Sequence, residues 1–373
     1  MLSKAAKAAP FVLLTLVAGC QRQDEENASD RNNQAQAQAE APAAAPAAPQ
    51  GQAGPVALTP EAVNAAAFVP VEGATEGPTP AVLRAQVLLD RTRFSPGVID
   101  GAPGENTRQA IAAFEAENGL PVDGQLDEQV FAKLTQLDNR PALTEYEITA
   151  QDVAGPFVPS IPEKYEEMSK LKALGYKDAE EALAERFHLT PELLRALNPN
   201  GQFAAGQRIV VPALGDDKLQ GDVKTIIVDK GERAVRVMGA DGRLLAFYPA
   251  TIGSDVLPSP EGVMTVRAVA PDPTYTFDPA KLSWDGAKKK VTVAAGPNNP
   301  VGSVWIDLSK DTYGIHGTPE PRHVGKRPSH GCVRLTNWDA EELASRVKAG
   351  VEVRFVQGSA APAGSKQAPP TRT

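Results

Sequence analysis

The chain has 373 residues, 42% of them hydrophobic and 23% charged, which is enough for two or three soluble globular domains. Its 38 Lys and Arg against 46 Asp and Glu give a net charge of -8, which argues against binding of duplex nucleic acid through a clustered basic face. Two cysteines cannot form a disulfide scaffold, and 33 Pro with 31 Gly indicate substantial linkers or turn-rich structure.

The first residues have the pattern of a secretory signal. Lys4 and Lys7 precede an apolar run over residues 11–18, and small residues follow it. The run is far shorter than the ~20 residues that a membrane-spanning helix needs. We therefore interpret residues 1–19 as a signal peptide, of the lipoprotein type that the residues at its end indicate.

The end of this signal, residues 16–20, resembles the lipobox of bacterial lipoproteins, in which the cysteine is acylated. The resemblance implies lipidation at Cys20, and the alternative is ordinary signal cleavage nearby. Gln21 after the cysteine resembles lipoproteins that are sent to the outer membrane. We expect a lipid-anchored protein of the periplasm, held at the outer membrane.

Two segments have compositions that do not support a packed core. Residues 20–79 are mostly Ala, Gln, Pro and Gly, which bury too little apolar surface to offset the entropy of ordering them. We predict a disordered tether there, and a disordered tail at residues 358–373.

Residues 80–138 predict a small three-helix domain, because apolar residues recur with helical spacing in three runs. Asn118 and Gly119 indicate a helix stop, and Asp127 is a suitable N-cap for the last helix. Residues 94–101, followed by 107–114, resemble the peptidoglycan-binding three-helix domain family. The alternative is a spacer bundle that binds nothing.

Residues 163–213 predict a second helical segment. Thr190 and Pro191 indicate a helix start, with a capping hydroxyl followed by proline at the first helical position. Residues 170–176 also read as helix. The segment resembles the second half of a LysM domain, a glycan-binding module, although the usual opening strand is not recognisable. A degenerate LysM-like segment with a purely structural role is the alternative.

Residues 222–357 predict a mainly β domain. Alternating apolar residues over 223–228, 233–237 and 262–266 indicate strands separated by Gly/Asp turns. One helix is expected with Asn337 as its N-cap and Gly350 at its end, before a closing strand over 351–355.

Chemically reactive side chains gather in a Gly- and Pro-rich stretch of this domain. Three of the 4 His and one Cys lie within seventeen residues: His316, His323, His330 and Cys332. A histidine that takes the proton of a thiol forms a thiolate–imidazolium pair, a strong nucleophile. Gly331 lets the backbone approach a substrate closely and can turn N–H groups toward a developing oxyanion.

The residue types of this cluster also suit two other interpretations. Three His and a Cys match the ligand types of a zinc site, but the loop lacks the compact paired spacing of such sites. Alternatively, Cys332 is a small buried hydrophobic residue and the histidines are ordinary surface loop residues.

His316-Gly317-Thr318, followed by residues 329–335, resembles the signature of the YkuD-like L,D-transpeptidases. The resemblance covers residues 222–357 and implies a YkuD-like β-sandwich with one or two helices. It also implies an acyl transfer on peptidoglycan. Cys332 would attack the diaminopimelate carbonyl of a tetrapeptide stem and release D-alanine, leaving a thioester that an amine resolves into a cross-link.

The resemblance also implies residue roles. Cys332 would be the nucleophile, His316 its base, and Gly317 the residue whose carbonyl orients that imidazole. His330 and Gly331 would line the oxyanion pocket. Arg334 would steady the site or hold a carboxylate, Ser329 would orient the loop, and His323 is expected in the substrate cleft.

This reaction needs no metal or other cofactor, and the sequence has no Gly-rich phosphate loop before a helix. Peptidoglycan is the expected partner, with no nucleic acid. A lipid anchor, a tether and two wall-binding-like modules would raise the effective concentration of substrate. The acceptor could be another stem, a free D-amino acid or the terminal lysine of an outer-membrane protein.

Two alternative functions follow from the same residues. Resolution of the thioester by water would make an L,D-carboxypeptidase or a hydrolase that detaches wall-bound protein. A non-catalytic lipoprotein that tethers the wall is the other class, although a binder has no use for an activated thiol.

Overall fold

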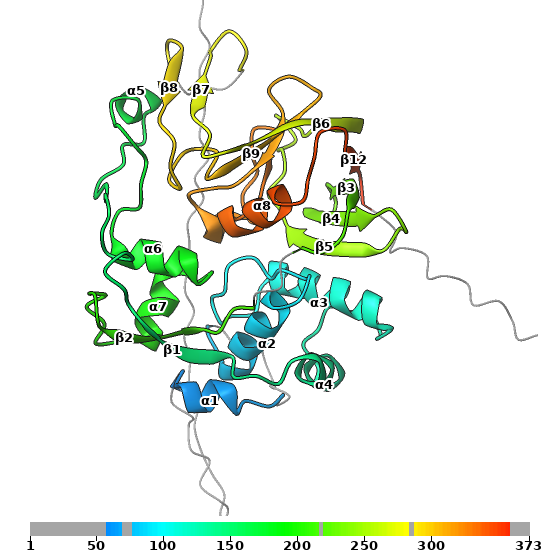
Figure 1. Ribbon diagram of the computed structural model, residues 1–373. Helices are drawn as coiled ribbons and strands as arrows, with labels where there is room; N and C mark the ends of the chain where they lie inside the picture. Colours follow the sequence, from blue (N-terminus) through cyan, green and yellow to red (C-terminus); the bar gives the residue numbers. More distant parts are fainter. Residues whose placement is uncertain (1–56, 69–76, 216–218, 283–286, 359–373) are drawn as a thin grey trace, which may run out of the picture. The chain divides into compact units, whose positions relative to one another are not determined.

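The computed structural model describes residues 57–68, 77–215, 219–282 and 287–358 (Figure 1). The predicted signal peptide, Cys20, most of the predicted tether and nearly all of the predicted tail lie outside these residues. In the described part of the chain, no helix combines the length and the apolar composition that a membrane crossing requires.

Three helices form the first compact part and confirm the predicted three-helix domain: α2 (Pro80–Asp90), α3 (Glu105–Asn118) and α4 (Glu128–Leu137). Asp127 caps α4 by accepting a hydrogen bond from the N–H of Val130. Gly119 ends α3 in the left-handed conformation, with φ of 68°, that favours glycine. Both capping expectations are confirmed.

The prediction of disorder is wrong at the C-terminal end of the predicted tether. Thr59 caps a short helix, α1 (Pro60–Asn64), whose Val63 is fully buried. The side chain of Asn64 also exchanges two hydrogen bonds with the backbone of Leu143. Disorder was predicted because the segment has few apolar residues. This end is nevertheless ordered, because Val63 packs into a core that residues distant in sequence supply.

The second helical part has the order strand, three helices, strand. Strand β1 (Leu143–Glu147) pairs antiparallel with β2 (Arg208–Pro212), and three short helices lie between them: α5 (Tyr165–Met168), α6 (Ala179–Arg186) and α7 (Pro191–Leu197). Thr190 caps α7, as predicted. The opening strand lies before residue 163, outside the predicted boundaries. The helix predicted over residues 170–176 is wrong, because α5 ends at Met168.

The two helical parts share one hydrophobic core. Val63, Leu83 and Ile99 belong to the same buried cluster as Leu183 and Leu194. The backbones also join, since the N–H of Ile99 donates to the carbonyl of His188 at 2.7 Å. The described residues between 57 and 214 therefore pack together rather than as separate domains joined by a linker.

The C-terminal part is mainly β, as predicted, and is built on one eight-stranded sheet in the order β11-β10-β9-β6-β12-β3-β4-β5. The strands are β3 (Val223–Asp229), β4 (Ala234–Gly239), β5 (Leu244–Pro249), β6 (Gly262–Pro271), β9 (Val304–Leu308), β10 (Gly314–His316), β11 (Val333–Arg334) and β12 (Glu352–Val356). Two further strands, β7 (Tyr275–Phe277) and β8 (Val291–Val293), form a separate hairpin.

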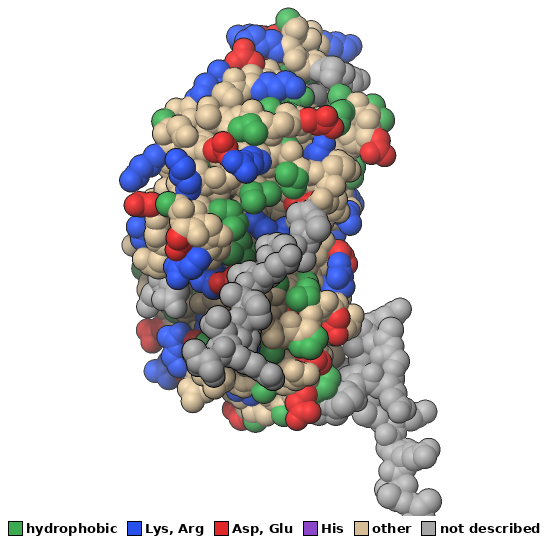
Figure 2. All heavy atoms as spheres, turned by 90° about the vertical axis from the view of Figure 1, so that its right-hand side faces the viewer, with side chains coloured by type: hydrophobic (Ala, Val, Ile, Leu, Met, Phe, Trp, Pro, Cys, Tyr) green, Lys and Arg blue, Asp and Glu red, His purple; other side chains and the backbone are tan. Residues whose placement is uncertain are grey.

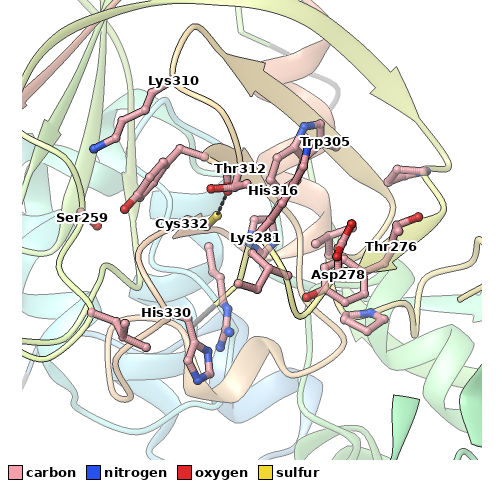
Figure 3. Close-up of a pocket in the computed structure, with 18 of the residues that line it drawn as sticks. Ser259, Thr276, Asp278, Lys281, Trp305, Lys310, Thr312, His316, His330 and Cys332 are labelled. Atoms are coloured by element: carbon pink, nitrogen blue, oxygen red, sulfur yellow. Dashed lines mark hydrogen bonds between the residues drawn. The ribbon is translucent and has the colours of Figure 1, made fainter. Parts of the chain in front are cut away.

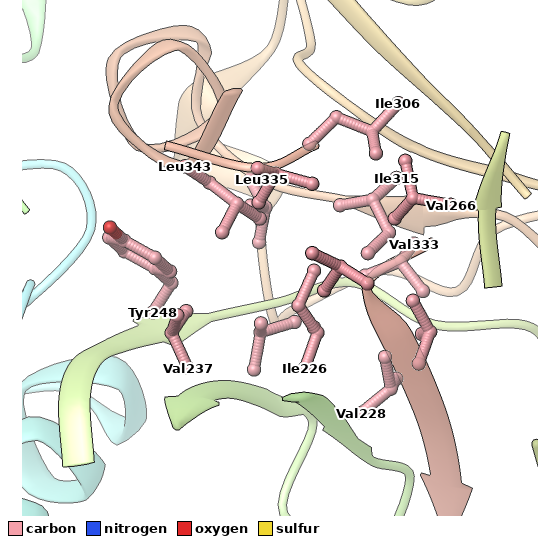
Figure 4. Packing of buried hydrophobic residues seen from close by; sticks show 14 of the residues in the cluster. Ile226, Val228, Val237, Tyr248, Val266, Ile306, Ile315, Val333, Leu335 and Leu343 are labelled. Atoms are coloured by element: carbon pink, nitrogen blue, oxygen red, sulfur yellow. The ribbon is translucent and has the colours of Figure 1, made fainter. Parts of the chain in front are cut away.

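The sheet curls so that strands from both of its ends enclose one core (Figure 4). Ile226 and Val237 from one half belong to the same buried cluster as Ile306, Ile315 and Val333 from the other half. Strand β6 pairs with β12 over its first residues and with β9 beyond Val266, where the register shifts. Such a shift bends a strand, and one continuous sheet thus forms both layers of the expected sandwich.

Helix α8 (Asn337–Ala344) contributes Ala340 and Leu343 to this core. Its N-cap is Thr336 rather than Asn337, and it ends at Ala344 rather than at Gly350. Thr336 is the better cap because its hydroxyl accepts from the N–H of Asp339, which leaves Asn337 free for other contacts. The predicted closing strand is confirmed as β12.

Edge strand β5 is covered by the three-helix part. The N–H of Phe247 donates to Arg93, and the N–H of Ser95 donates to Phe247. Covering a sheet edge removes a site for aggregation. On the face shown in Figure 2, Lys and Arg are interspersed with Asp and Glu rather than gathered in a patch of one sign.

Candidate active site

The predicted catalytic residues lie on two adjacent strands at one end of the sheet. Strand β10 runs parallel to β11, with His316 opposite Arg334 and Ile315 opposite Val333. Ile315 and Val333 are fully buried in the sheet's core. Because side chains alternate along a strand, His316, Arg334 and Cys332, which immediately precedes β11, lie on the other face.

This face forms part of a cavity of about 920 Å³ (Figure 3). Cys332, His316, His330 and Arg334 all line it. Much of the remaining wall comes from residues 257–261 and 310–313, from residues 273–282, from Tyr165 of α5 and from Trp305 of β9. The sequence-predicted thiol and imidazole therefore share one accessible cavity, large enough for a peptide-sized ligand.

Cys332 is half-buried, and its Sγ donates to the backbone carbonyl of Thr312 at 3.4 Å. Burial raises the pKa of this thiol, against smaller opposing contributions from the backbone of Gly314 and the charge of Arg334. At neutral pH the resting residue is therefore a thiol rather than a thiolate.

His316 is buried, with 3% of its surface exposed. Its Nδ1 lies 2.6 Å from the carbonyl oxygen of Gly317, and because a carbonyl only accepts, Nδ1 carries the proton. The unprotonated Nε2 is then left as the basic nitrogen. The ring stacks on Trp305 with centroids 5.5 Å apart and planes at 21°.

Burial and, to a smaller extent, the charge of Arg334 lower the pKa of His316 to about 3, against the opposing contribution of the hydrogen bond to Gly317. The imidazole is thus neutral and can accept a proton throughout the neutral range. The expected thiolate–imidazolium pair is not the resting state, because burial disfavours both charges. Proton transfer from sulfur then has to accompany attack on a substrate.

The loop before Cys332 is held by two serine hydroxyls. Ser329 Oγ donates to the carbonyl of Cys332 at 2.6 Å and accepts from the N–H of Gly331 at 3.1 Å. From the opposite side, Ser259 Oγ donates to the carbonyl of Gly331 at 2.8 Å. These contacts fix the turn that presents the thiol.

Gly331 is required at this turn. Its φ is 116°, and a side-chain carbon there would lie 2.9 Å from the ring of Tyr313. Its N–H is already bonded to Ser329, so Gly331 contributes the shape of the turn rather than its own amide to an oxyanion pocket.

Arg334 places a positive charge inside the cavity. It is half-buried, and its Nε is buried without a hydrogen-bond partner among the described residues. Burial and the charge of Arg334 together lower the pKa of His330, an exposed residue of the cavity wall. An unsatisfied guanidinium N–H is suited to a carboxylate ligand.

His323 is not in the wall of this cavity. It belongs to the short 3-10 helix η1 (Pro321–His323), where Nδ1 lies 2.5 Å from Glu320 Oε2. It lines another cavity, of about 400 Å³, together with Arg327 and Arg334. The described residues contain no group of three or more His, Cys, Asp or Glu side chains able to hold a metal ion.

Several wall residues were missed by the sequence analysis: Trp305, Thr312, Ser259 and Tyr165. Each acts through a contact between segments far apart in sequence, such as the stacking of Trp305 on His316. Thr312 has a φ of 68°, a conformation that is rare for threonine, and no local sequence pattern predicts this conformation. Only the folded chain identifies these residues.

A buried neutral imidazole and a thiol that share one cavity define a candidate cysteine-nucleophile site. Residues 223–355 match the family model of the YkuD L,D-transpeptidase catalytic domain. Residues 78–134 match the family described as "Putative peptidoglycan binding domain". Neither model covers residues 163–213, and the LysM resemblance is not confirmed.

Two Bacillus proteins, each named "Putative L,D-transpeptidase YkuD", are similar to this chain. The Bacillus licheniformis protein is 32% identical over 177 residues, covering 46% of this chain and 90% of that protein. The Bacillus subtilis protein is 30% identical over 178 residues, covering 47% and 92%. The chain therefore belongs to the YkuD family of L,D-transpeptidases, and its family and relatives indicate an enzyme of that activity.

Among solved structures, the chain is similar to L,D-transpeptidase 3 from Mycobacterium tuberculosis, with 15% identity and a TM-score of 0.31. That similarity covers 41% of this chain and 76% of the solved one.

Proposed function

We propose that this chain is an L,D-transpeptidase that acts on peptidoglycan through a thioester at Cys332. The observation that carries the proposal is the placement of His316 on β10 and of Cys332 directly before the adjacent strand β11, both in the wall of one cavity. The match to the YkuD catalytic domain supports the reaction class, and the second match supports peptidoglycan as the polymer.

In the first half-reaction, Cys332 Sγ attacks the diaminopimelate carbonyl of a tetrapeptide stem, and its proton passes to His316 Nε2. The bond to D-alanine then breaks, and the proton leaves with the amine of D-alanine. An acceptor amine attacks the thioester in the second half-reaction. It gives up a proton through His316, and Sγ leaves as the restored thiol.

The neighbouring groups have supporting roles in this proposal. Gly317 keeps the proton on His316 Nδ1, so that Nε2 faces the reaction as a base. We assign oxyanion stabilisation to the backbone at Cys332, because the N–H of Gly331 is occupied. Arg334 would bind a carboxylate of the stem, and Ser329 would hold the turn.

The test uses the full chain without lipid and a purified diaminopimelate-containing disaccharide tetrapeptide. We expect a wild-type adduct at the mass of the stem minus D-alanine, together with a dimeric product. Cys332→Ala should give neither, while still binding the cell wall. An adduct with only the shortened tripeptide would indicate hydrolysis instead, and a fully active Cys332→Ala would remove the thiol mechanism.

We also propose that the protein is anchored by a lipid on Cys20 in the periplasm, at the outer membrane. The lipobox-like sequence supports this proposal, and Cys20 lies outside the described residues. Labelling with a radioactive fatty acid should mark the wild-type chain but not Cys20→Ala. Equal labelling of both, or of neither, would refute the anchor.

A further inference from the structure

Asn337, the first residue of α8, lies directly behind the site and is almost fully buried. Its Oδ1 accepts from the N–H of Ser303 at 3.2 Å. A side-chain carbon on Gly317 would lie 2.1 Å from the same oxygen, and one on Gly302 would lie 2.0 Å from it. The amide of Asn337 is thus packed against the backbone of Gly317.

Gly317 is the residue that orients the imidazole. Its carbonyl lies 2.6 Å from His316 Nδ1, and its N–H donates to Val304 at 3.2 Å. Because Gly317 has no side chain, nothing separates its backbone from Asn337. A shift of Asn337 would move the carbonyl that holds the ring of His316.

The other end of the Asn337 amide is held by the helical part of the chain. Nδ2 donates to Glu185 Oε1 at 2.6 Å and to the carbonyl of Pro297 at 3.2 Å. Glu185 belongs to α6, which lies outside both family matches. The next residue of α8, Trp338, stacks on His188 with centroids 4.7 Å apart.

We propose that Glu185 and Asn337 are positioning residues for catalysis. Through them the helical part fixes the carbonyl of Gly317 and, with it, the imidazole of His316. This inference rests on the proposed function of His316. It gives α6 a part in the chemical step itself, whereas a delivery module would only raise the local concentration of substrate.

Kinetics on a small soluble donor separate the two roles, because delivery to the wall does not affect such a donor. In the full chain, Glu185→Ala should lower kcat about tenfold with KM little changed, as expected when a catalytic group is displaced slightly. Glu185→Gln keeps an acceptor oxygen for Asn337 and should restore kcat to nearly the wild-type value. Glu185→Met keeps the volume but has no such oxygen, and should lose as much as Glu185→Ala.

Glu181→Ala is the matched control. Glu181 lies on the same helix and also contacts the C-terminal part, where its Oε2 accepts from Asn298 Nδ2 at 3.0 Å. Asn298 follows Pro297, but Glu181 does not bond to Asn337 itself, and this variant should keep kcat within about twofold of wild type, on the scale of a small surface change. The melting temperature of each variant verifies that it is folded.

Three outcomes would overturn the inference while leaving the proposed function intact. These are a wild-type kcat in folded Glu185→Met, an equal loss in Glu181→Ala, and a failure of Glu185→Gln to restore turnover. A wild-type chain that forms neither adduct nor product on the donor would instead overturn the proposed function, and this inference with it.

Discussion

His316 and His188 stack on tryptophan rings in two different regions of the molecule. His316 faces Trp305 in the cavity wall, with centroids 5.5 Å apart and planes at 21°. His188 faces Trp338 where the helical part meets α8, at 4.7 Å and 8°. The two ring contacts are similar, but the charged groups nearby differ in sign: Arg334 acts on His316, and carboxylates act on His188.

Burial acts to lower the pKa of both histidines. At His316 the positive charge of Arg334 acts in the same direction, and the pKa is lowered to about 3. At His188 burial is the largest single influence, but the carboxylates of Asp90, which lies 2.9 Å from Nδ1, and of Asp339 and Glu185 together outweigh it and raise the pKa. The neighbouring charges thus act in opposite directions: Arg334 adds to the burial that keeps His316 neutral, whereas the carboxylates favour the charged form of His188.

The largest expected effect is on the neutral ring. His316→Ala removes the group that takes the proton of Cys332, and we expect turnover to fall at least a hundredfold, as is usual for loss of a general base. Turnover of the soluble tetrapeptide donor measures it, with the melting temperature as a check of folding. A near-normal rate would assign the base to another residue.

The second prediction concerns the charged ring. Asp90→Asn removes the partner of His188, and we expect the free energy of unfolding at pH 6 to fall by about 2 kcal/mol, since both side chains are largely buried. Urea unfolding measures the loss. Asp241→Asn breaks an exposed pair with Arg243 and should cost less than about 0.5 kcal/mol.

The pH dependence of this loss has a definite sign. Because the pKa of His188 is raised on folding, its stabilisation is complete below the unfolded pKa of about 6.5 and is lost as pH rises through the folded value. The difference between wild type and Asp90→Asn should therefore be larger at pH 6 than at pH 9. An equal difference at both pH values would show that His188 is not charged in this pair.

The two regions also differ in how far the sequence predicts them. Cys332 and His316 were found because a thiol, glycines and histidines lie close together in the chain, and that proximity survives folding on two adjacent strands. His188 was overlooked, because Asp90 and Trp338 are distant in sequence and meet it only through tertiary packing.

The sequence predicts the fold where the hydrophobic pattern of a short segment is enough to define a helix or a strand. Helical spacing identified α2, α3 and α4, and alternation identified the β domain. Strand β1 was missed because residues 148–178 separate it in sequence from helices α6 and α7, which lie in the same helical part. The shared core of the helical parts was missed because Ile99 and Leu183 signal burial but not their partners.

A third prediction tests the resting state of the thiol. Because burial raises the pKa of Cys332, alkylation by iodoacetamide should rise about tenfold per pH unit above neutral, as the thiolate fraction does. No inflection is expected near pH 6.5, because the pKa of His316 is about 3. Mass spectrometry of a Cys20→Ala chain measures the rate at a single thiol. A plateau already reached below pH 7 would show a preformed ion pair.

The smallest expected effect is a shift in the pKa of His316 when the positive charge of Arg334 is removed. Arg334→Gln should raise the pKa of His316, since Arg334 lowers it, and should raise the pKa of Cys332 for the same reason. Burial is the larger cause for His316, so its pKa should stay well below 6.5. NMR of the imidazole ring across pH 3–8 measures the shift. A His316 that titrated at its ordinary pKa in this variant would make Arg334 the dominant cause. The contrast with His188 would then rest on the opposite signs of the neighbouring charges, with burial contributing little at His316.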